Sequence, residues 1–426
     1  MTTLITNISS LVNTRTENKL LRGEELADLP CIENAYLVIE DVVIGDCGKM
    51  DDLIHNTWSF TESYDATGRF VLPAWCDSHT HVVFTGSREE EFVDKLKGFS
   101  YAEIAARGGG ILNSAKRIND ISEEDLFIES WKRLDEISKL GTGAIEIKSG
   151  YGLSVEGELK MLRVIKKLKE KSSLSIKSTF LGAHTFPLEY KENHQGYIDL
   201  ILNEMLPVIA EEKLADFIDV FCEKGFFSPE ETETICRAGM AYGLRPKLHV
   251  NQLNSIGGIE TGIKLNALSL DHLETITPED IDRLSGRNTS LKYEPWSGLC
   301  TLLPTAAFFL RMPFQPARQL IDSGCAIALA TDYNPGSSPS GNMNFVIALS
   351  CIQMKMLPQE AINAATINGA YAMQFQDEVG SITIGKKANL IFTKPLTSLA
   401  SLSYSFGTNL IDNVMIQGEW LSLPSN

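Results

Sequence analysis

Eight short apolar runs restrict the fold of this chain more than any other feature of its sequence. One run ends at His81, and the others lie at residues 143–150, 175–184, 217–225, 246–252, 267–272, 289–295 and 325–336. Polar or glycine-containing residues end each run, and helical patterns separate most of the runs. Strands that are joined through helices pair in parallel, because a parallel neighbour needs a crossover connection. The pattern therefore predicts an α/β protein.

One of the intervening helices is clear at residues 122–141. Ser122 and Asp125 resemble a capping box, apolar residues recur at helical spacing, and Gly141 ends the pattern. Eight such β/α units, spread over about 300 residues, are typical of a (β/α)8 TIM barrel, whose usual size is near 250 residues before insertions. We therefore predict a TIM barrel.

Both ends of the chain have a different pattern. Strand-like runs with glycine between them lie at residues 3–12, 35–48 and 61–73, and again at 380–393 and 411–423. We expect these segments to pair in one small β-sandwich domain formed by both termini. The expected boundaries are residues 1–70 and 376–426 for that domain, and 71–375 for the barrel.

The composition excludes several classes of function. The net charge of −17 argues against binding to nucleic acid or to an anionic membrane, and it means that an anionic substrate needs a local cation. The N-terminal segment lacks the features of a secretory signal, and no apolar run approaches the roughly 20 residues that cross a bilayer. The eight cysteines are scattered without a C-x-x-C pair. We expect reduced thiols in a cytoplasmic protein.

Histidines are concentrated at the ends of the predicted strands. Five of the seven histidines in the chain lie there, and Asp332 ends the eighth run. The five are His79, His81, His184, His249 and His272. In a TIM barrel the carboxyl ends of all strands meet at one face, where the chemistry takes place. One histidine in such a position is usually structural, but five with an aspartate are hard to attribute to structure alone.

These residue types together indicate a metal site. Zinc binds imidazole nitrogen and carboxylate oxygen, and a catalytic site keeps one position open for water. The expected ligands are His79, His81, His249 and Asp332. His184 and His272 then remain for substrate binding or proton transfer. We expect one metal ion per chain, divalent or trivalent, and these ligands suit zinc and iron equally.

The same residues give the chain a resemblance to the amidohydrolase superfamily, with H-x-H on strand one, histidines on strands five and six, and aspartate on strand eight. That pattern also admits deaminases that act on cytosine- or guanine-like rings. Four further stretches resemble the imidazolonepropionases, and this resemblance covers essentially the whole chain. They are GSREEEF (86–92), EIKSGYGLS (146–154), FLGAHTFP (180–187) and TDYNPGSSP (331–339).

The resemblance implies a hydrolase of histidine catabolism that opens the ring of 4-imidazolone-5-propanoate to give N-formimino-L-glutamate. It implies substrate contacts at Arg88, Tyr151, His184, Gln252 and Ser337, and product contacts at Tyr151, Asn334 and Gly336. It also implies that His272 handles protons beside the metal water, and in the mechanism that we expect, either Asp332 or His272 is the catalytic residue that takes the proton of the water. Such an enzyme binds a small anionic molecule, and a homodimer is expected from base rates and from the family.

Arg88 and Tyr151 each have an alternative to the role that the resemblance implies. The Arg88 guanidinium can bind a carboxylate through two hydrogen bonds, but it could instead form a surface ion pair with Glu89, Glu90 or Glu91. Tyr151 lies between two glycines, where the backbone can approach a ligand, but it could also be a packed loop aromatic.

Lys148, the glycine-rich segment 106–111 and Gln252 each admit more than one interpretation. Lys148 lies on the second strand, whereas the carboxylated lysine of two-metal amidohydrolases belongs to the fourth, so we predict one metal and a supporting role for Lys148. The glycine-rich segment 106–111 is interpreted as a lid, or as an ordinary turn. Gln252 occupies a position where deaminases usually have glutamate, and glutamine cannot act as a base. A catalytically inactive barrel that binds a partner is the remaining alternative.

Overall fold

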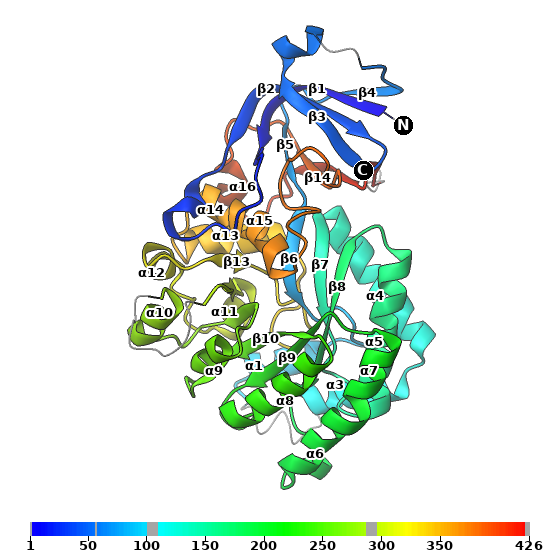
Figure 1. Cartoon of the computed structure of the whole chain (residues 1–426), viewed down its shortest axis with the longest axis vertical. Coiled ribbons are helices and arrows are strands. Elements are labelled where there is room, and N and C mark those ends of the chain that lie inside the picture. Colours follow the sequence, from blue (N-terminus) through cyan, green and yellow to red (C-terminus); the bar gives the residue numbers. More distant parts are fainter. Residues whose placement is uncertain (1, 56–57, 100–109, 287–295, 422–426) are drawn as a thin grey trace.

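The barrel predicted from the sequence is present in the computed structural model, which describes residues 2–55, 58–99, 110–286 and 296–421. Figure 1 shows the barrel below a smaller sheet. The barrel strands are β6 (Trp75–Thr80), β7 (Thr142–Lys148), β8 (Ser175–Ala183), β9 (Phe217–Cys222), β10 (Arg245–Val250), β11 (Ser269–His272), β12 (Leu299–Leu302) and β13 (Ile327–Leu329). They pair in parallel in chain order. The predicted α/β fold class is confirmed.

The barrel closes between its first and last strands, next to two residues of the predicted site. Thr80 forms a parallel bridge with Tyr333, just beyond β13. The Asp332 amide donates to the His79 carbonyl at 3.0 Å, and the His81 amide donates to the Tyr333 carbonyl at 2.9 Å. Closure therefore fixes the backbone of His79 and His81 against that of Asp332.

The seventh strand begins later in the sequence than predicted. The predicted run at residues 289–295 lies outside the described residues. The strand that pairs with both β11 and β13 is β12, Leu299–Leu302. All four β12 residues are buried. A run this short, without alternation, carries too little periodic signal to be recognised as a strand.

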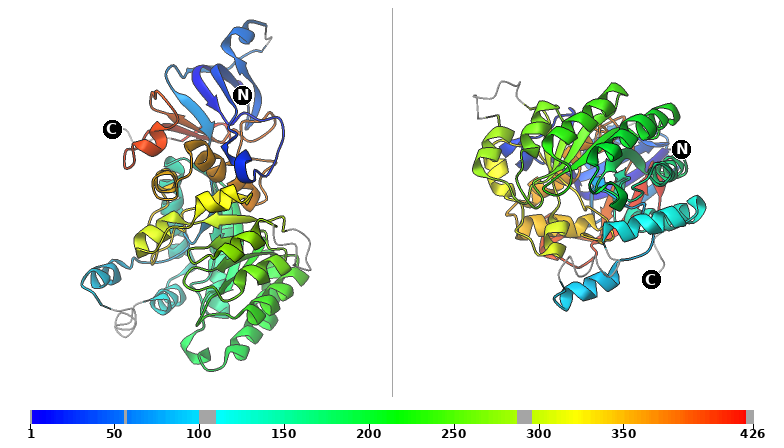
Figure 2. Two further views of the ribbon diagram at one scale, coloured as in Figure 1. Left: turned by 90° about the vertical axis from the view of Figure 1, so that its left-hand side faces the viewer. Right: turned by 90° about the horizontal axis from the view of Figure 1, so that it is seen from below.

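Helices surround the barrel strands (Figure 2). The α-helices in the first half are α1 (Glu89–Leu96), α3 (Ile111–Asp120), α4 (Glu123–Lys139), α5 (Val155–Lys171), α6 (His194–Leu200), α7 (Leu206–Glu212) and α8 (Pro229–Ala241). Those in the second half are α9 (Gly258–Lys264), α10 (Pro278–Leu284), α11 (Pro304–Leu310), α12 (Ala317–Asp322), α13 (Met343–Ile352), α14 (Pro358–Ala365), α15 (Ile367–Ala372) and α16 (Ser401–Tyr404). Short 3-10 turns are η1 (Gly23–Ala27), η2 (Met50–His55) and η3 (Leu188–Tyr190), and η4 (Ile201–Met205) is a π-helical turn. Ser122 caps α4 as predicted, since its hydroxyl accepts from the Asp125 amide at 3.1 Å.

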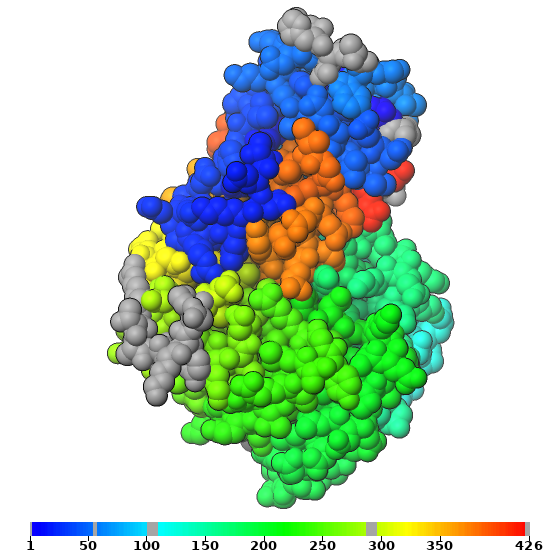
Figure 3. All heavy atoms as spheres, in the orientation of Figure 1, coloured from blue at the N-terminus to red at the C-terminus, as the bar shows by residue number. Residues whose placement is uncertain are grey.

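The second sheet combines strands from both ends of the chain. Its strands are β1 (Thr2–Val12), β2 (Cys31–Glu40), β3 (Val43–Lys49), β4 (Glu62–Asp65), β5 (Phe70–Pro73), β14 (Leu390–Thr393), β15 (Ile411–Ile416) and β16 (Glu419–Trp420). The join is an antiparallel pair between β5 and β14. In Figure 3 the N-terminal segments and those near residue 385 lie side by side above the barrel. A separate apolar core, which includes Ile5, Leu37 and Phe392, packs within this sheet.

The cysteines and the helices bear on what the composition predicted. All eight cysteines are free thiols, and none forms a disulfide. Within the described ranges, no helix combines the length and the apolar character that crossing a membrane requires.

Candidate active site

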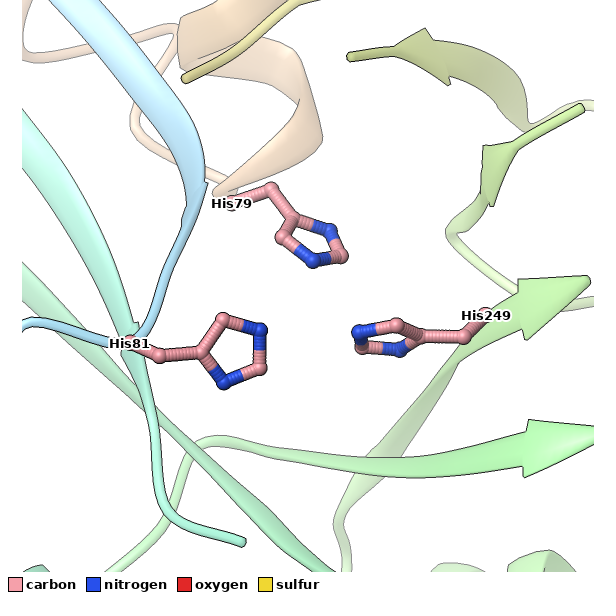
Figure 4. Close-up of side chains that lie close together, drawn as sticks. All are labelled: His79, His81 and His249. Atoms are coloured by element: carbon pink, nitrogen blue, oxygen red, sulfur yellow. The ribbon is translucent and has the colours of Figure 1, made fainter. Parts of the chain in front are cut away.

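The structure brings the predicted metal ligands together at the carboxyl ends of the barrel strands. His79 and His81 come from the end of β6, and His249 comes from β10 (Figure 4). Ring nitrogens of these three histidines lie within 4.8 Å of one another. A second set, formed by His79, His272 and Asp332, meets the same criterion. The two sets share His79, so they lie next to each other.

Asp332 lies within reach of the same centre. Its Oδ1 atom is 3.4 Å from His81 Nε2 and 3.6 Å from His79 Nε2. His79 Nε2, His81 Nδ1 and both ring nitrogens of His249 are buried without a hydrogen-bond partner among the described residues. Buried polar atoms are rarely left unpaired, and imidazole nitrogens beside a carboxylate are the ligands that zinc and iron prefer. The donor set therefore fits a metal ion.

The protonation states favoured by this environment are those that bind metal. Burial lowers the pKa of His79 well below its usual value and that of His249 to about 4, so both rings are neutral at neutral pH. Burial alone would raise the pKa of Asp332, but the surrounding histidines outweigh burial and lower it. Neutral imidazole and ionised carboxylate are the forms in which these side chains bind metal.

His272 has a different environment from the other histidines. Its Nδ1 lies 3.2 Å from the Glu274 carboxylate, which also accepts from Gln315 Nε2 at 3.0 Å. Burial alone would lower the pKa of His272, but Glu274 and other nearby carboxylates outweigh burial and raise it to about 8. A group that titrates near neutral pH suits acid–base chemistry. His272 also has a positive φ of 85°, a strained backbone conformation of the kind that clusters at functional sites.

A cavity of about 540 Å³ lies beside this cluster. Its wall includes every residue for which the sequence suggested substrate or product contact. These residues are Arg88, Tyr151, His184, Gln252, Asn334, Gly336 and Ser337. They come from five segments that are distant in the sequence, so the fold is what assembles them.

Arg88 forms the ion pair that its sequence context suggested, and it also lines the cavity. Its Nε and Nη2 atoms donate to Glu91 Oε2 at 2.8 and 2.5 Å, so the neighbouring ion pair does form. The pair is not on the open surface, because the Arg88 side chain is only 14% exposed and lines the cavity. A Cβ atom on Gly336 would lie 2.2 Å from Arg88 Nη1, so a larger residue there would displace the guanidinium.

Glu91 also accepts a hydrogen bond from the Gly110 amide at 2.9 Å. Gly110 and Ile111 are the described residues of the predicted glycine-rich lid. The rest of that segment, residues 106–109, lies outside the described residues.

Tyr151 and His184 pack against His81, one of the candidate metal ligands. The Tyr151 ring lies 5.8 Å from the His81 ring and 5.4 Å from the His184 ring. His184 Nδ1 lies 2.9 Å from the Gly150 carbonyl, which can only accept, so Nδ1 carries the proton. Burial lowers the pKa of His184 well below its usual value. His184 Nε2 is therefore a hydrogen-bond acceptor beside the candidate metal ligands.

Asn334 and Ser337 are largely engaged within their own loop. The Asn334 amide nitrogen donates to the Asp332 carbonyl and to Ser337 Oγ, and its oxygen accepts from the Gly336 and Ser337 amides. Ser337 Oγ lies 3.2 Å from Asp332 Oδ2, so it contacts a predicted metal ligand. Gln252, in contrast, has no side-chain hydrogen bond to the described residues and can face a ligand.

Buried charged side chains lie behind the histidines, and sequence reasoning singled out Lys148 among them but missed its partners. Lys148 contacts Glu146 and Asp219 at 2.5 and 2.8 Å, and it lies behind the metal ligands, not among them. Lys247 and Asp271 complete the set. A signal for it exists, because Glu146 and Lys148 alternate along an otherwise apolar strand and so face the same side.

Comparison with known proteins identifies the family. Residues 227–421 match the profile of the amidohydrolase family. The chain is 59% identical over 420 residues to imidazolonepropionase of Flavobacterium johnsoniae, covering 98% of this chain and 100% of that protein. The chain belongs to the imidazolonepropionase family. Family membership and the histidine-rich cluster together support a metal cofactor.

Solved structures place this imidazolonepropionase-family chain in a wider fold group. Escherichia coli guanine deaminase superposes with a TM-score of 0.72 at 14% identity, covering 100% of both chains. A zinc-bound adenosine deaminase from Xanthomonas campestris superposes with a TM-score of 0.70 at 15% identity, covering 98% of this chain and 92% of that one. At this identity the likeness concerns the fold alone.

Proposed function

We infer that this chain hydrolyses 4-imidazolone-5-propanoate to N-formimino-L-glutamate, a step of L-histidine catabolism. The observation that carries this conclusion is the 59% identity to an imidazolonepropionase over essentially the whole of both chains. The predicted substrate residues, which line one cavity beside the candidate metal ligands, agree with it.

We propose that one zinc or iron ion binds His79, His81, His249 and Asp332. When bound, such an ion lowers the pKa of water to about 7 and polarises a carbonyl group. The chain contributes three imidazole rings and one carboxylate, all buried, so that little solvent competes for the ion.

Proton movements are assigned to His272 and Asp332. One of them accepts the proton of the attacking water while the water oxygen bonds to the ring carbonyl carbon. An N–H of His272 then donates to the developing oxyanion, a contact of a kind worth about 3–4 kcal/mol. The same residues return the proton to the ring nitrogen, which leaves with the electron pair of the broken C–N bond.

Substrate contacts are assigned within the cavity. Arg88 holds the propionate, while Tyr151, His184, Gln252 and Ser337 surround the ring. Gln252 has an amide, so it orients the ring and does not act as the base. Asn334 and Gly336 join Tyr151 in contacting the product.

We also propose a cytoplasmic protein that acts on a small anionic molecule without nucleic acid or membrane partners. The net charge of −17 supports the absence of such partners. A homodimer is proposed from the prevalence of symmetric dimers among oligomeric proteins.

The test is direct. Purified zinc- or iron-loaded protein is added to imidazolone propionate, and loss of the substrate's ultraviolet absorbance is followed, with cytosine and guanine as alternative substrates. We expect turnover of imidazolone propionate alone, and none with the Asp332→Ala variant. Release of ammonia from cytosine or guanine would instead identify a deaminase, and metal binding without any turnover would indicate an inactive barrel.

A further inference from the structure

Five charged side chains with no exposed surface lie inside the barrel, behind the candidate metal ligands. They are Glu146, Lys148, Asp219, Lys247 and Asp271. These residues come from strands β7, β9, β10 and β11. Burial removes each charge from water, which is unfavourable unless the charges are paired.

Two of the carboxylates contact the rings of candidate metal ligands. Asp271 Oδ2 lies 2.6 Å from His79 Nδ1. Asp219 Oδ2 lies 2.9 Å from His249 Nδ1, an electrostatic contact whose angles fall outside hydrogen-bond geometry, and its Oδ1 accepts from the His249 backbone amide at 3.1 Å. A carboxylate at this range favours a proton on the nearby ring nitrogen, which leaves the lone pair on Nε2.

The two lysines hold these carboxylates in place. Lys148 Nζ lies 2.8 Å from Asp219 Oδ2 and 3.9 Å from Asp271 Oδ2, so one ammonium group serves both. Lys148 and Lys247 bind opposite oxygens of Glu146. Lys247 also donates to the Ser78 carbonyl at 3.0 Å, directly before His79 in the chain.

We propose that this buried network positions the metal ligands before any metal is present. Lys148 fixes Asp219 and Asp271, which hold the His249 and His79 rings with Nδ1 protonated and Nε2 directed at the common centre. The inference builds on the metal ligands of the proposed function but not on its substrate.

A role confined to stability explains the network less well. Buried ion pairs are often no more stabilising than apolar side chains of similar volume. The contacts at the ring nitrogens have a direct chemical consequence, because they select the tautomer. These carboxylates are accordingly positioning residues, which act through the histidines and not on the substrate.

The first measurement is zinc affinity of the metal-free protein, determined by competition with a chelator. We expect Asp271→Asn and Asp219→Asn each to weaken zinc binding about 10–100-fold, the usual effect of losing a partner that orients a ligand. Asp280→Asn is the matched control, because Asp280 is buried in the α10 capping box and contacts none of the candidate ligands. Its zinc affinity should equal that of the wild type.

The second measurement is the tautomer, read from nitrogen NMR of the metal-free protein with labelled histidine. The wild type should show His79 and His249 protonated at Nδ1, and Lys148→Met should yield mixed tautomers. If Lys148→Met does not fold, the two aspartate variants decide the matter. Unchanged zinc affinity and unchanged tautomers in natively folded D271N and D219N would overturn the proposal. Absence of turnover in a wild type with the expected tautomers would instead count against the proposed substrate alone.

Discussion

Arg88 shares its guanidinium between Glu91 and the cavity, and this arrangement determines what its replacement should do. Two of its nitrogens are held by the carboxylate, which orients the third toward Gly336. An arginine that is oriented in this way loses little side-chain entropy when an anion binds.

Arg88→Ala should raise KM for imidazolone propionate about 10–100-fold and change kcat little, because charge-assisted hydrogen bonds contribute about 1.5–3 kcal/mol. Steady-state kinetics would measure both constants. Lys97→Ala is the control, since Lys97 lies on the same segment with its side chain 62% exposed. An unchanged KM in R88A would assign Arg88 to the ion pair alone.

His272 lies beside the candidate metal ligands, and its Nδ1 contacts the Glu274 carboxylate. His272→Ala should keep the bound metal and lose about 10²–10⁴-fold in kcat, the usual contribution of a general acid or base. Metal content by elemental analysis and turnover of the same sample would measure the two effects. Loss of the metal would make His272 a ligand, and turnover like that of the wild type would remove it from the mechanism.

The sequence predicts residues at strand ends better than residues whose role depends on their neighbours. His79, His81 and His249 stand out because a rare residue recurs at the tips of apolar runs. The sequence does not indicate that the Asn334 side-chain amide forms hydrogen bonds within its own loop. Asp271 likewise looks like any polar residue before a strand end, since its partner His79 is 192 residues away in the chain.

At the scale of elements, buried carboxylates hold the loops that carry ligand-facing residues. Glu158 on α5 accepts from the amides of Gly150, Gly152 and Leu153 at 3.0, 2.7 and 3.0 Å, and so encloses Tyr151. Glu223, after β9, similarly accepts from the Leu253 and Asn254 amides, beside Gln252. Neighbouring strands and helices therefore determine the shape of the loops above them.

Glu158→Gln should loosen the Tyr151 loop, because the glutamine amide has one acceptor oxygen where the carboxylate has two. We expect KM to rise several-fold and the unfolding free energy to fall by about 1–3 kcal/mol. Kinetics and denaturant titration would measure these effects. Glu156→Gln, an exposed position on the same helix, should change neither quantity. Equal behaviour of the two variants would contradict a supporting role for Glu158.

The alternation of strands and helices could be predicted, because each strand corresponds to a short apolar run and each helix to apolar residues at helical spacing. The position of β12 could not, since its four buried residues are too few for a pattern. What fixes β12 is pairing on both sides with β11 and β13, a constraint that exists only in the closed barrel.

Over the whole molecule, the charge of the cavity is opposite to that of the protein. The net charge is −17, yet the described residues that line the cavity include Arg88, Lys95 and Arg311 and no carboxylate. Positive charges around a cavity in a negatively charged protein attract an anion locally, and salt screens this attraction.

We therefore expect kcat/KM to fall as ionic strength rises, with a weaker dependence in Lys95→Met and Arg311→Met. Rates measured from low salt to about 0.5 M would show this, because the Debye length shortens from tens of ångströms to a few. Lys97→Met should retain the dependence of the wild type. The same slope in all four proteins would exclude a steering role for the two cations.

Lys386 should affect stability at high pH. Its side chain is buried and donates to the Val379 carbonyl and to Ser381 Oγ, and burial lowers its pKa to about 8. The unfolded chain keeps the proton up to about pH 10.4, so between these values the unfolded state binds more protons and stability rises with pH.

Relative to the wild type, Lys386→Met should lack this contribution to the rise in unfolding free energy between about pH 8 and 10. Chemical denaturation at several pH values would measure the difference between the two proteins. A constant difference across that range would mean that Lys386 titrates normally in the folded state.

The pairing of β5 with β14 has a consequence for biosynthesis. A ribosome makes the N-terminal strands first, and their partners emerge only after the entire barrel has been translated. Until then β5 has an unsatisfied edge, which is a template for intermolecular association. Cells that make this protein must keep nascent chains from aggregating for the time that translation of the barrel takes.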